Sequence, residues 1–161
     1  MKAVIQRVSS ASVSVDGQLI SQIGKGLCVL IGICQSDTEK DLEFIARKIL
    51  NIRLFEHDGK RWQKSVKDQN LEVLCISQFT LYHRLKGNKP DFHNAMQGEK
   101  AQLMYQDLLK RLGTNYDSEK IKDGVFGAMM EVNIVNSGPV TIEIESPSNS
   151  NNTESEKTDD S

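Results

Sequence analysis

Two short strings place small polar side chains where an apolar run ends, and such positions can bind a substrate. Ser77-Gln78-Phe79-Thr80 follows the apolar run 71–76, and Asn136-Ser137-Gly138-Pro139 separates two alternating runs. The first string offers hydroxyls and an amide, but no side chain that readily accepts a proton at neutral pH. Unpaired backbone N–H groups of Phe79 and Thr80 could stabilise the oxyanion formed when an ester is hydrolysed.

Other uses of the first string stay open. Ser77 and Thr80 could simply cap a turn, which is a common use of these residue types at a strand end. Thr80 could be a nucleophile, but with no neighbouring base it would be a poor one, so we favour a positional role. His83 lies three residues beyond Thr80, while His57 and His93 are remote in sequence, so spacing alone leaves a Ser-His-Asp arrangement open.

The second string contains the one bond type with an accessible cis form. X-Pro bonds are cis in ~5% of folded cases, so the sequence alone favours a trans Gly138-Pro139 bond. The flanking runs, 129–135 and 140–145, alternate between apolar and polar residues. They are therefore expected to be two strands that pair with each other.

Apolar spacing elsewhere predicts further strands. A hairpin is expected over 4–23 with Asp16-Gly17 in its turn. The run 27–33 is apolar on both faces and should be a core strand covered on two sides, and a strand over 71–76 should deliver Ser77.

Two helices are expected to pack on this sheet. Ser36 and Glu39 have the spacing of a capping box ahead of a helix over about 37–51. A second helix is expected over about 94–112, ended by Gly113 in the left-handed conformation. The order of elements predicts an α+β domain with curved, mostly antiparallel or mixed sheet.

Length and composition predict one domain followed by a polar tail. The chain has 161 residues, 38% apolar and 26% charged, and its apolar runs are far shorter than the ~20 residues of a membrane span. Residues 1–146 should form the domain, and 147–161, which lack apolar residues, should be disordered. The net charge of −2 comes from this tail, so RNA binding by the nearly neutral domain would need a local basic patch.

The cysteines and the N-terminal residues further limit the class of protein. Cys28, Cys34 and Cys75 lie in apolar runs without metal-ligand spacing, so we expect packed thiols, no metal and no cofactor. The first apolar stretch breaks too early for a secretory signal, which favours the cytoplasm.

Five strings in order resemble the D-aminoacyl-tRNA deacylase family over residues 1 to about 146. Besides the two above, they are Val4-Ile5-Gln6-Arg7-Val8, the stretch 86–93 and Lys122-Asp123-Gly124-Val125-Phe126-Gly127. The resemblance implies a barrel-like fold and a pocket lined by Ser77-Gln78-Phe79-Thr80. It also implies an obligate homodimer in which a cis Gly138-Pro139 enters the partner's active site.

The same resemblance implies a substrate and a way to select it. The substrate would be a D-aminoacyl ester on the terminal ribose of tRNA, whose 2′-hydroxyl could orient the attacking water. Main-chain carbonyls of Gly138 and Pro139 would exclude L-aminoacyl groups, while glycyl-tRNA would escape this filter. Asn136 belongs to the same string, and Arg7 is expected to hold the Gly-Pro loop by hydrogen bonds to carbonyls, unless it is only a surface arginine.

Weaker signals concern RNA. Arg84, Lys86 and Lys89 could meet acceptor-stem phosphates, or they could form an ordinary solvated loop. Phe126 and Met130, on either side of Gly127, could wall the terminal adenine, with core packing as the alternative. Two other functions stay open, namely a nucleic-acid-binding protein without turnover and a purely structural dimer module.

Overall fold

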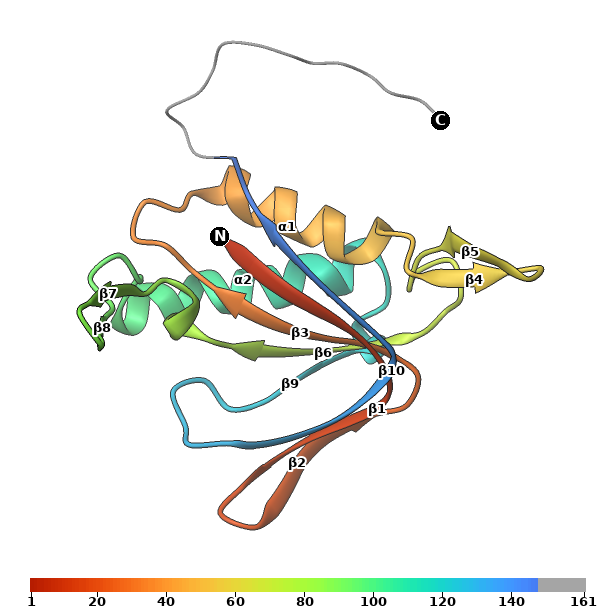
Figure 1. Ribbon diagram of the computed structural model, residues 1–161, viewed down its shortest axis with the longest axis horizontal. Coiled ribbons are helices and arrows are strands. Elements are labelled where there is room, and N and C mark those ends of the chain that lie inside the picture. The colour runs from red at the N-terminus through yellow and green to blue at the C-terminus, as the bar shows by residue number, and fades with distance from the viewer. Residues whose placement is uncertain (148–161) are drawn as a thin grey trace.

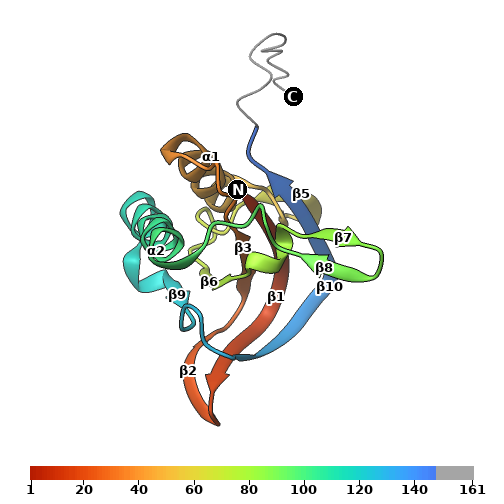
Figure 2. The same cartoon turned by 90° about the vertical axis from the view of Figure 1, so that its left-hand side faces the viewer.

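The computed structural model describes residues 1–147 as one curved sheet with two helices on the same side of it (Figure 1). Strands run in the order β10-β1-β3-β6-β9, and β2 pairs with β1. Figure 2, turned by 90°, shows the sheet curling into a barrel-like shape with α1 and α2 side by side. The α+β prediction is confirmed. The strand bounds are β1 Lys2–Val15, β2 Gln18–Ile23, β3 Gly26–Gly32, β6 Glu72–Ser77, β9 Ile121–Asp123 and β10 Glu131–Glu145.

The sheet is mixed because two kinds of connection build it. β1 is antiparallel to β2, β3 and β10, and the β1–β2 turn at Asp16 and Gly17 has positive φ at both residues, as a two-residue hairpin requires. β3 pairs in parallel with β6, and β6 with β9, since helices α1 and α2 form the crossovers.

The predicted core strand is confirmed as β3. Leu27, Val29 and Ile31 are buried in the main core with both helices, while Cys28 packs into a second cluster on the opposite face. Burial on both faces explains why this strand reads as a continuous apolar run.

Helix α1 spans Glu39–Asn51, so the predicted helix is confirmed but its expected cap is wrong. The capping box is formed by Thr38 and Asp41, two residues after the expected pair of Ser36 and Glu39. Asp41 accepts the Thr38 backbone N–H at 2.8 Å, which satisfies a donor at the start of the helix.

Helix α2 spans Gly98–Asn115, and the prediction that Gly113 ends it is wrong. Gly113 lies inside the last turn, and a Cβ there would be 3.2 Å from Ser118. This glycine therefore permits the close approach of the following 3-10 turn η2, Ser118–Lys120, rather than a left-handed cap.

Strand β10 corrects the prediction of two strands that pair with each other. Residues 131–135 of the first run and all of the second run, 140–145, belong to one strand, and both halves pair with β1. The register passes from Val8 opposite Asn136 to Gln6 opposite Thr141, so four residues of β10 face Arg7 alone. These four, 137–140, form a bulge that contains Gly138-Pro139.

Two small hairpins extend from the domain. One consists of β4 Phe55–His57 and β5 Lys60–Lys64, and the other of β7 Arg84–Lys86 and β8 Lys89–Asp91. The second replaces the expected loop. Figure 1 shows the hairpins at opposite ends of the molecule.

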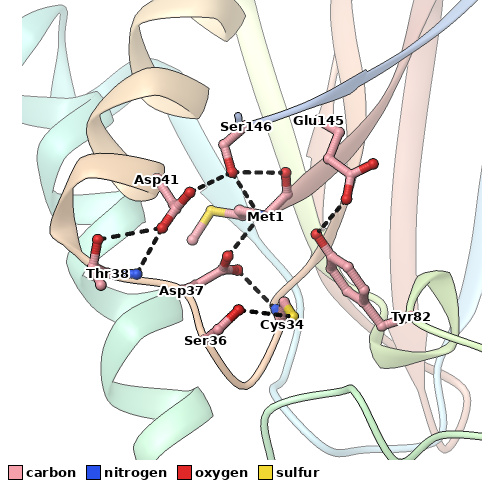
Figure 3. Close-up of polar contacts among 9 residues, drawn as sticks. All are labelled: Met1, Cys34, Ser36, Asp37, Thr38, Asp41, Tyr82, Glu145 and Ser146. Atoms are coloured by element: carbon pink, nitrogen blue, oxygen red, sulfur yellow. Dashed lines mark hydrogen bonds and ion pairs between the residues drawn. The ribbon is translucent and has the colours of Figure 1, made fainter. Parts of the chain in front are cut away.

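Both ends of the domain meet in a polar cluster at the start of α1 (Figure 3). The Met1 ammonium donates to Asp37 Oδ1 at 2.7 Å and to Ser146 Oγ at 2.8 Å, and Ser146 Oγ donates to Asp41 Oδ1 at 2.7 Å. Burial raises the pKa of Asp37, although the ammonium and the Cys34 N–H act in the opposite direction. The cluster fixes the N-terminus of β1 beside the end of β10.

Within residues 1–147, no helix is long and apolar enough to cross a membrane. The tail expected to be disordered lies, from residue 148 on, outside the described residues.

Candidate active site

The Ser77–Thr80 string lies where β6 ends and the 3-10 turn η1, Phe79–Leu81, begins. Gln78 N–H donates to the Ile31 carbonyl at 2.7 Å, so the turn is tied to the neighbouring strand β3. Its approach to β3 is close, because a Cβ on Gly32 would lie 2.8 Å from Leu81 Cβ and 3.3 Å from the Gln78 carbonyl oxygen. A glycine at the end of β3 thus sets the position of the turn.

The polar groups of the turn form a hydrogen-bonded set without a base. Gln78 Nε2 donates to Thr80 Oγ1 at 2.5 Å. The His83 ring contacts the Thr80 carbonyl oxygen at 2.9 Å, not the hydroxyl. Among residues 1–147, no histidine hydrogen-bonds to the side chain of Ser77 or Thr80, and we find no partner for the N–H groups of Phe79 and Thr80. Backbone N–H groups without a partner are of the kind that can stabilise an oxyanion.

Next to the turn lies a pocket of about 620 Å³, whose walls come from four parts of the chain. Ser77–Thr80 form one wall, and the loop 126–130, which contains Phe126, Gly127 and Met130, forms another. Phe126 also packs against Tyr105, with ring centroids 5.6 Å apart. Its pocket-lining and core-packing roles are therefore combined.

The remaining walls were missed by sequence reasoning. They come from the ends of β3 and β6, from the start of α2 and from the start of β10, and consist of Ile31, Ile33, Ile76, Met96, Gln97, Gly98, Ala101 and Val132. These are mostly apolar residues in apolar runs, so only the tertiary arrangement distinguishes them from other core positions.

Behind the pocket, a buried polar pair holds α2 against the sheet. Tyr105 OH donates to Asp123 Oδ1 at 2.5 Å and to the Cys75 carbonyl at 3.1 Å. Burial raises the pKa of Asp123, and the hydrogen bonds from Tyr105 and the Gly124 N–H only partly counteract this. The pair supports the wall that carries Phe126.

Gly138-Pro139 lines a second cavity, of about 570 Å³, together with Arg7 and Trp62. The Gly138-Pro139 bond is cis, and both residues are exposed. Arg7 donates from Nε to the Ser137 carbonyl at 3.1 Å and from Nη1 to the Leu54 carbonyl at 2.7 Å. Arg7 therefore joins the bulge to the chain just before β4, as a hydrogen-bonding residue and not a free surface arginine.

The two predicted strings do not meet within one chain. No residue is shared by the pocket at Ser77–Thr80 and the cavity at Gly138-Pro139. The first lies beside η1 and the β7–β8 end of the molecule, and the second beside the β4–β5 hairpin at the other end (Figure 1). Asn136 is also away from the pocket, and its amide donates to Gln6 Oε1 at 3.2 Å.

The basic residues suggested for RNA lie on the β7–β8 hairpin that follows η1. Arg84, Lys86 and Lys89 are exposed, and Lys86 Nζ is 3.4 Å from Asp91 Oδ2. The pKa of Asp91 is held below its usual value by the His93 N–H first and then by Lys86. A small group of exposed basic residues thus follows the η1 turn in the chain.

Unpaired N–H groups on a turn beside a pocket are typical of hydrolases that act on acyl bonds. Residues 4–145 match the family model of D-Tyr-tRNA(Tyr) deacylase. The chain belongs to this D-aminoacyl-tRNA deacylase family.

Individual relatives agree with this placement. The D-aminoacyl-tRNA deacylase of Drosophila melanogaster is 68% identical over 91% of this chain and 93% of its own length. D-aminoacyl-tRNA deacylase 1 of Homo sapiens is 60% identical over 91% of this chain and 71% of its own.

Two solved structures have the same fold. The c-Myc DNA Unwinding Element Binding Protein is 59% identical, with a TM-score of 0.89 over 92% of this chain and 100% of its own. A probable eukaryotic D-amino acid tRNA deacylase is 15% identical, with a TM-score of 0.77 over 89% of this chain and 98% of its own. At this low identity, the likeness supports the fold but not a function.

Proposed function

We propose that this chain hydrolyses the ester bond between a D-amino acid and tRNA, and that Ser77–Thr80 form its catalytic wall. The observation that carries the proposal is the η1 turn, whose Phe79 and Thr80 N–H groups face no partner in residues 1–147 while no base lies near Thr80 Oγ1. Such a site suits a reaction in which charge on oxygen must be stabilised but proton transfer comes from elsewhere.

In the proposed reaction, water attacks the ester carbonyl carbon and the Phe79 and Thr80 N–H groups bind the resulting oxyanion. The tetrahedral intermediate then expels the ribose 3′-oxygen, which takes up the proton that the attacking water loses, so that free D-amino acid and tRNA leave. The neighbouring 2′-hydroxyl of the terminal adenosine orients the water, since the protein offers no side-chain base at this turn. One oxyanion donor is typically worth about 3 kcal/mol in the transition state.

Chiral selection in this proposal depends on a homodimer. Each chain inserts its Gly138-Pro139 bulge into the Ser77–Thr80 pocket of the other, and Arg7 holds the bulge in position. The support is the separation of the two strings in one chain, together with the exposure of Gly138 and Pro139. Carbonyls at the bulge would admit a D-aminoacyl group and obstruct its mirror image. Glycine, with no side chain, would pass, so glycyl-tRNA is a second substrate.

The tRNA would be held beside this site. Arg84, Lys86 and Lys89 meet acceptor-stem phosphates, and Phe126 and Met130 enclose the terminal adenine with Gly127 between them. We place the protein in the cytoplasm, where charged tRNA is used.

A second candidate is nucleic-acid binding without turnover. It is favoured by the likeness to the c-Myc DNA Unwinding Element Binding Protein, whose name describes DNA binding. The intact η1 turn favours the enzyme, because binding alone would not need unpaired N–H groups in a pocket.

Incubation with D-tyrosyl-tRNA and L-tyrosyl-tRNA separates these functions. The enzyme should release D-tyrosine and spare the L-ester, whereas a binding protein would retain both tRNAs uncleaved.

The shared active site is tested by a heterodimer of two inactive variants. Ala128→Trp fills the pocket, and deletion of Gly138 and Pro139 leaves two residues opposite Arg7, the count of an ordinary β-bulge. A co-expressed, doubly tagged heterodimer has one intact pocket facing one intact bulge, so it should recover about half of the wild-type activity in a two-fold dimer. An inactive heterodimer, or a monomer in sedimentation, would show that the bulge does not act across subunits.

A further inference from the structure

Three side chains connect the end of the η1 turn to the strand pair β1–β10. Tyr82 follows η1 directly, and its hydroxyl donates to Glu145 Oε1 at 3.3 Å (Figure 3). Lys2 Nζ lies 4.9 Å from the centroid of the Tyr82 ring and donates to the Leu81 carbonyl at 3.4 Å. Lys2 and Glu145 are register partners on adjacent strands, so both hold the turn from the same place.

We propose that Lys2, Tyr82 and Glu145, here called the η1 clamp, are positioning residues that hold the Phe79 and Thr80 N–H groups in their catalytic geometry. The inference rests on the deacylase reaction proposed above, and none of the three residues lines the pocket.

The need for such a clamp follows from how the turn is attached. Its first end is fixed, because Gln78 N–H bonds to Ile31 on β3. Its second end leads into the exposed β7–β8 hairpin, and Phe79 at its centre is itself 52% exposed. Without a tie at Tyr82, the turn would be held firmly at one end only. Exposed backbone with few buried contacts opens readily.

The chemistry of the clamp is suited to a persistent contact. Both partners of Tyr82 are charged: Glu145 accepts a hydrogen bond from the hydroxyl, and Lys2 lies over the ring face. The two contacts therefore hold different parts of the same side chain. Burial raises the pKa of Tyr82, as do the charges of Asp37 and Glu145. The hydroxyl therefore stays protonated and remains a donor to Glu145 throughout the physiological range.

The clamp also joins the two halves of the proposed site. β1 and β10 carry Lys2 and Glu145 at one end, and they carry Arg7 and the Gly138-Pro139 bulge further along. The strand pair that presents the bulge to a partner is thus the same pair that positions the chain's own pocket wall.

Tyr82→Phe removes only the hydroxyl bond, and Lys2→Met removes both the charge above the ring and the bond to the Leu81 carbonyl. Each should lower kcat for D-tyrosyl-tRNA by about 3- to 10-fold with little change in KM, and the double variant by up to about 100-fold, the cost of a misplacement near 1 Å. Lys2→Arg and Glu145→Gln keep a cation and an acceptor, so they should restore most of kcat. The backbone N–H groups of Leu81 and Tyr82 should exchange hydrogen faster in the damaging variants.

Tyr116→Phe is the matched control, since Tyr116 OH donates to the Leu71 carbonyl at 2.8 Å, outside the pocket lining. It should lower Tm and leave kcat unchanged. Wild-type kcat and exchange in Tyr82→Phe and Lys2→Met, or a lowered Tm without a change in kcat, would refute the positioning role. If the wild-type protein fails to cleave D-tyrosyl-tRNA, the proposed function is wrong. Faster hydrogen exchange of the Leu81 and Tyr82 N–H groups in the variants would still support the clamp.

Discussion

Gly32→Ala should damage catalysis from a position outside the pocket lining. Gly32 ends β3 beneath η1, and an added Cβ would lie 2.8 Å from Leu81 Cβ, 3.3 Å from the Gln78 carbonyl oxygen and 3.3 Å from the Tyr82 ring. Two of these three neighbours lie on or next to the backbone of the turn, so no flexible side-chain end can simply move aside. The turn itself must shift away from β3.

The size of that shift sets the expected effect. Carbon atoms pack at about 3.5–4.0 Å, so relief of the 2.8 Å contact requires a movement of roughly 1 Å. A misplacement of about 1 Å can lower the rate about 100-fold. Overpacking of this kind typically costs about 1–3 kcal/mol of unfolding free energy, which a domain of this size should survive.

The assay is single-turnover cleavage of D-tyrosyl-tRNA, with thermal unfolding measured in parallel. Gly24→Ala is the matched control, because its nearest neighbour would be the flexible Glu72 Oε1 at 3.8 Å. We expect Gly24→Ala to resemble the wild type in both assays. If Gly32→Ala cleaves at the wild-type rate, the catalytic geometry of the turn does not depend on its close contact with Gly32, and the reasoning is wrong.

Four further predictions follow from the structure. Thr80→Ala should keep measurable activity, with kcat lowered about tenfold, because in the proposed site Thr80 orients Gln78 and does not act as a nucleophile. A folded variant whose kcat falls by about 10⁶-fold would show that Thr80 is the nucleophile. Arg7→Lys should weaken D-over-L selection, measured with both tyrosyl-tRNAs, since an ammonium cannot reproduce the fork that joins the Ser137 and Leu54 carbonyls. Lys89→Gln should reduce the slope of log Kd for tRNA against log salt by about 1, and an unchanged slope would remove this lysine from the RNA surface. Asp41 should contribute to acid stability: burial opposes its charge, but the Thr38 N–H, the Ser146 hydroxyl and the N-terminal ammonium outweigh it and hold its pKa below the usual value. Its contribution is fully present above about pH 4 and is lost as pH falls through the lowered pKa, so urea unfolding of Asp41→Asn and wild type should converge in acid.

Local chemistry in the sequence was enough to predict the elements whose signals lie within a few residues. The Asp16-Gly17 turn, the doubly buried strand β3 and the apolar face of α1 follow from such signals. The sequence prediction placed the cap of α1 two residues too early. Two possible capping boxes begin at Ser36 and at Thr38, and local chemistry alone does not choose between them. Asp41 accepts a hydrogen bond from Ser146, whose hydroxyl is itself bonded by the Met1 ammonium, and both residues are remote from Asp41 in sequence.

Long-range pairing explains the larger errors. Nothing near residues 129–145 indicates that both runs lie along β1, since that depends on the 14-residue length of β1. The end of α2 was also missed, because Gly113 serves a close contact with Ser118 instead of a left-handed turn. The polar wall of the pocket could be predicted from Ser77–Thr80, but its apolar walls come from β3 and α2 and have no local signal.

The bulge in β10 gives a physical reason for the proposed dimer. Within a regular sheet, carbonyl oxygens are occupied by pairing, so they are not free to contact a substrate. Four residues of β10 face only Arg7, so the carbonyls of Gly138 and Pro139 are not used in strand pairing. This bulge, however, lies at the end of the molecule remote from η1. A chain that selects handedness with its main chain must therefore obtain these oxygens from a second copy. In the proposed dimer, each active site therefore combines one chain's η1 turn, which stabilises the oxyanion, with the other chain's bulge, which holds the D-aminoacyl group in place for cleavage.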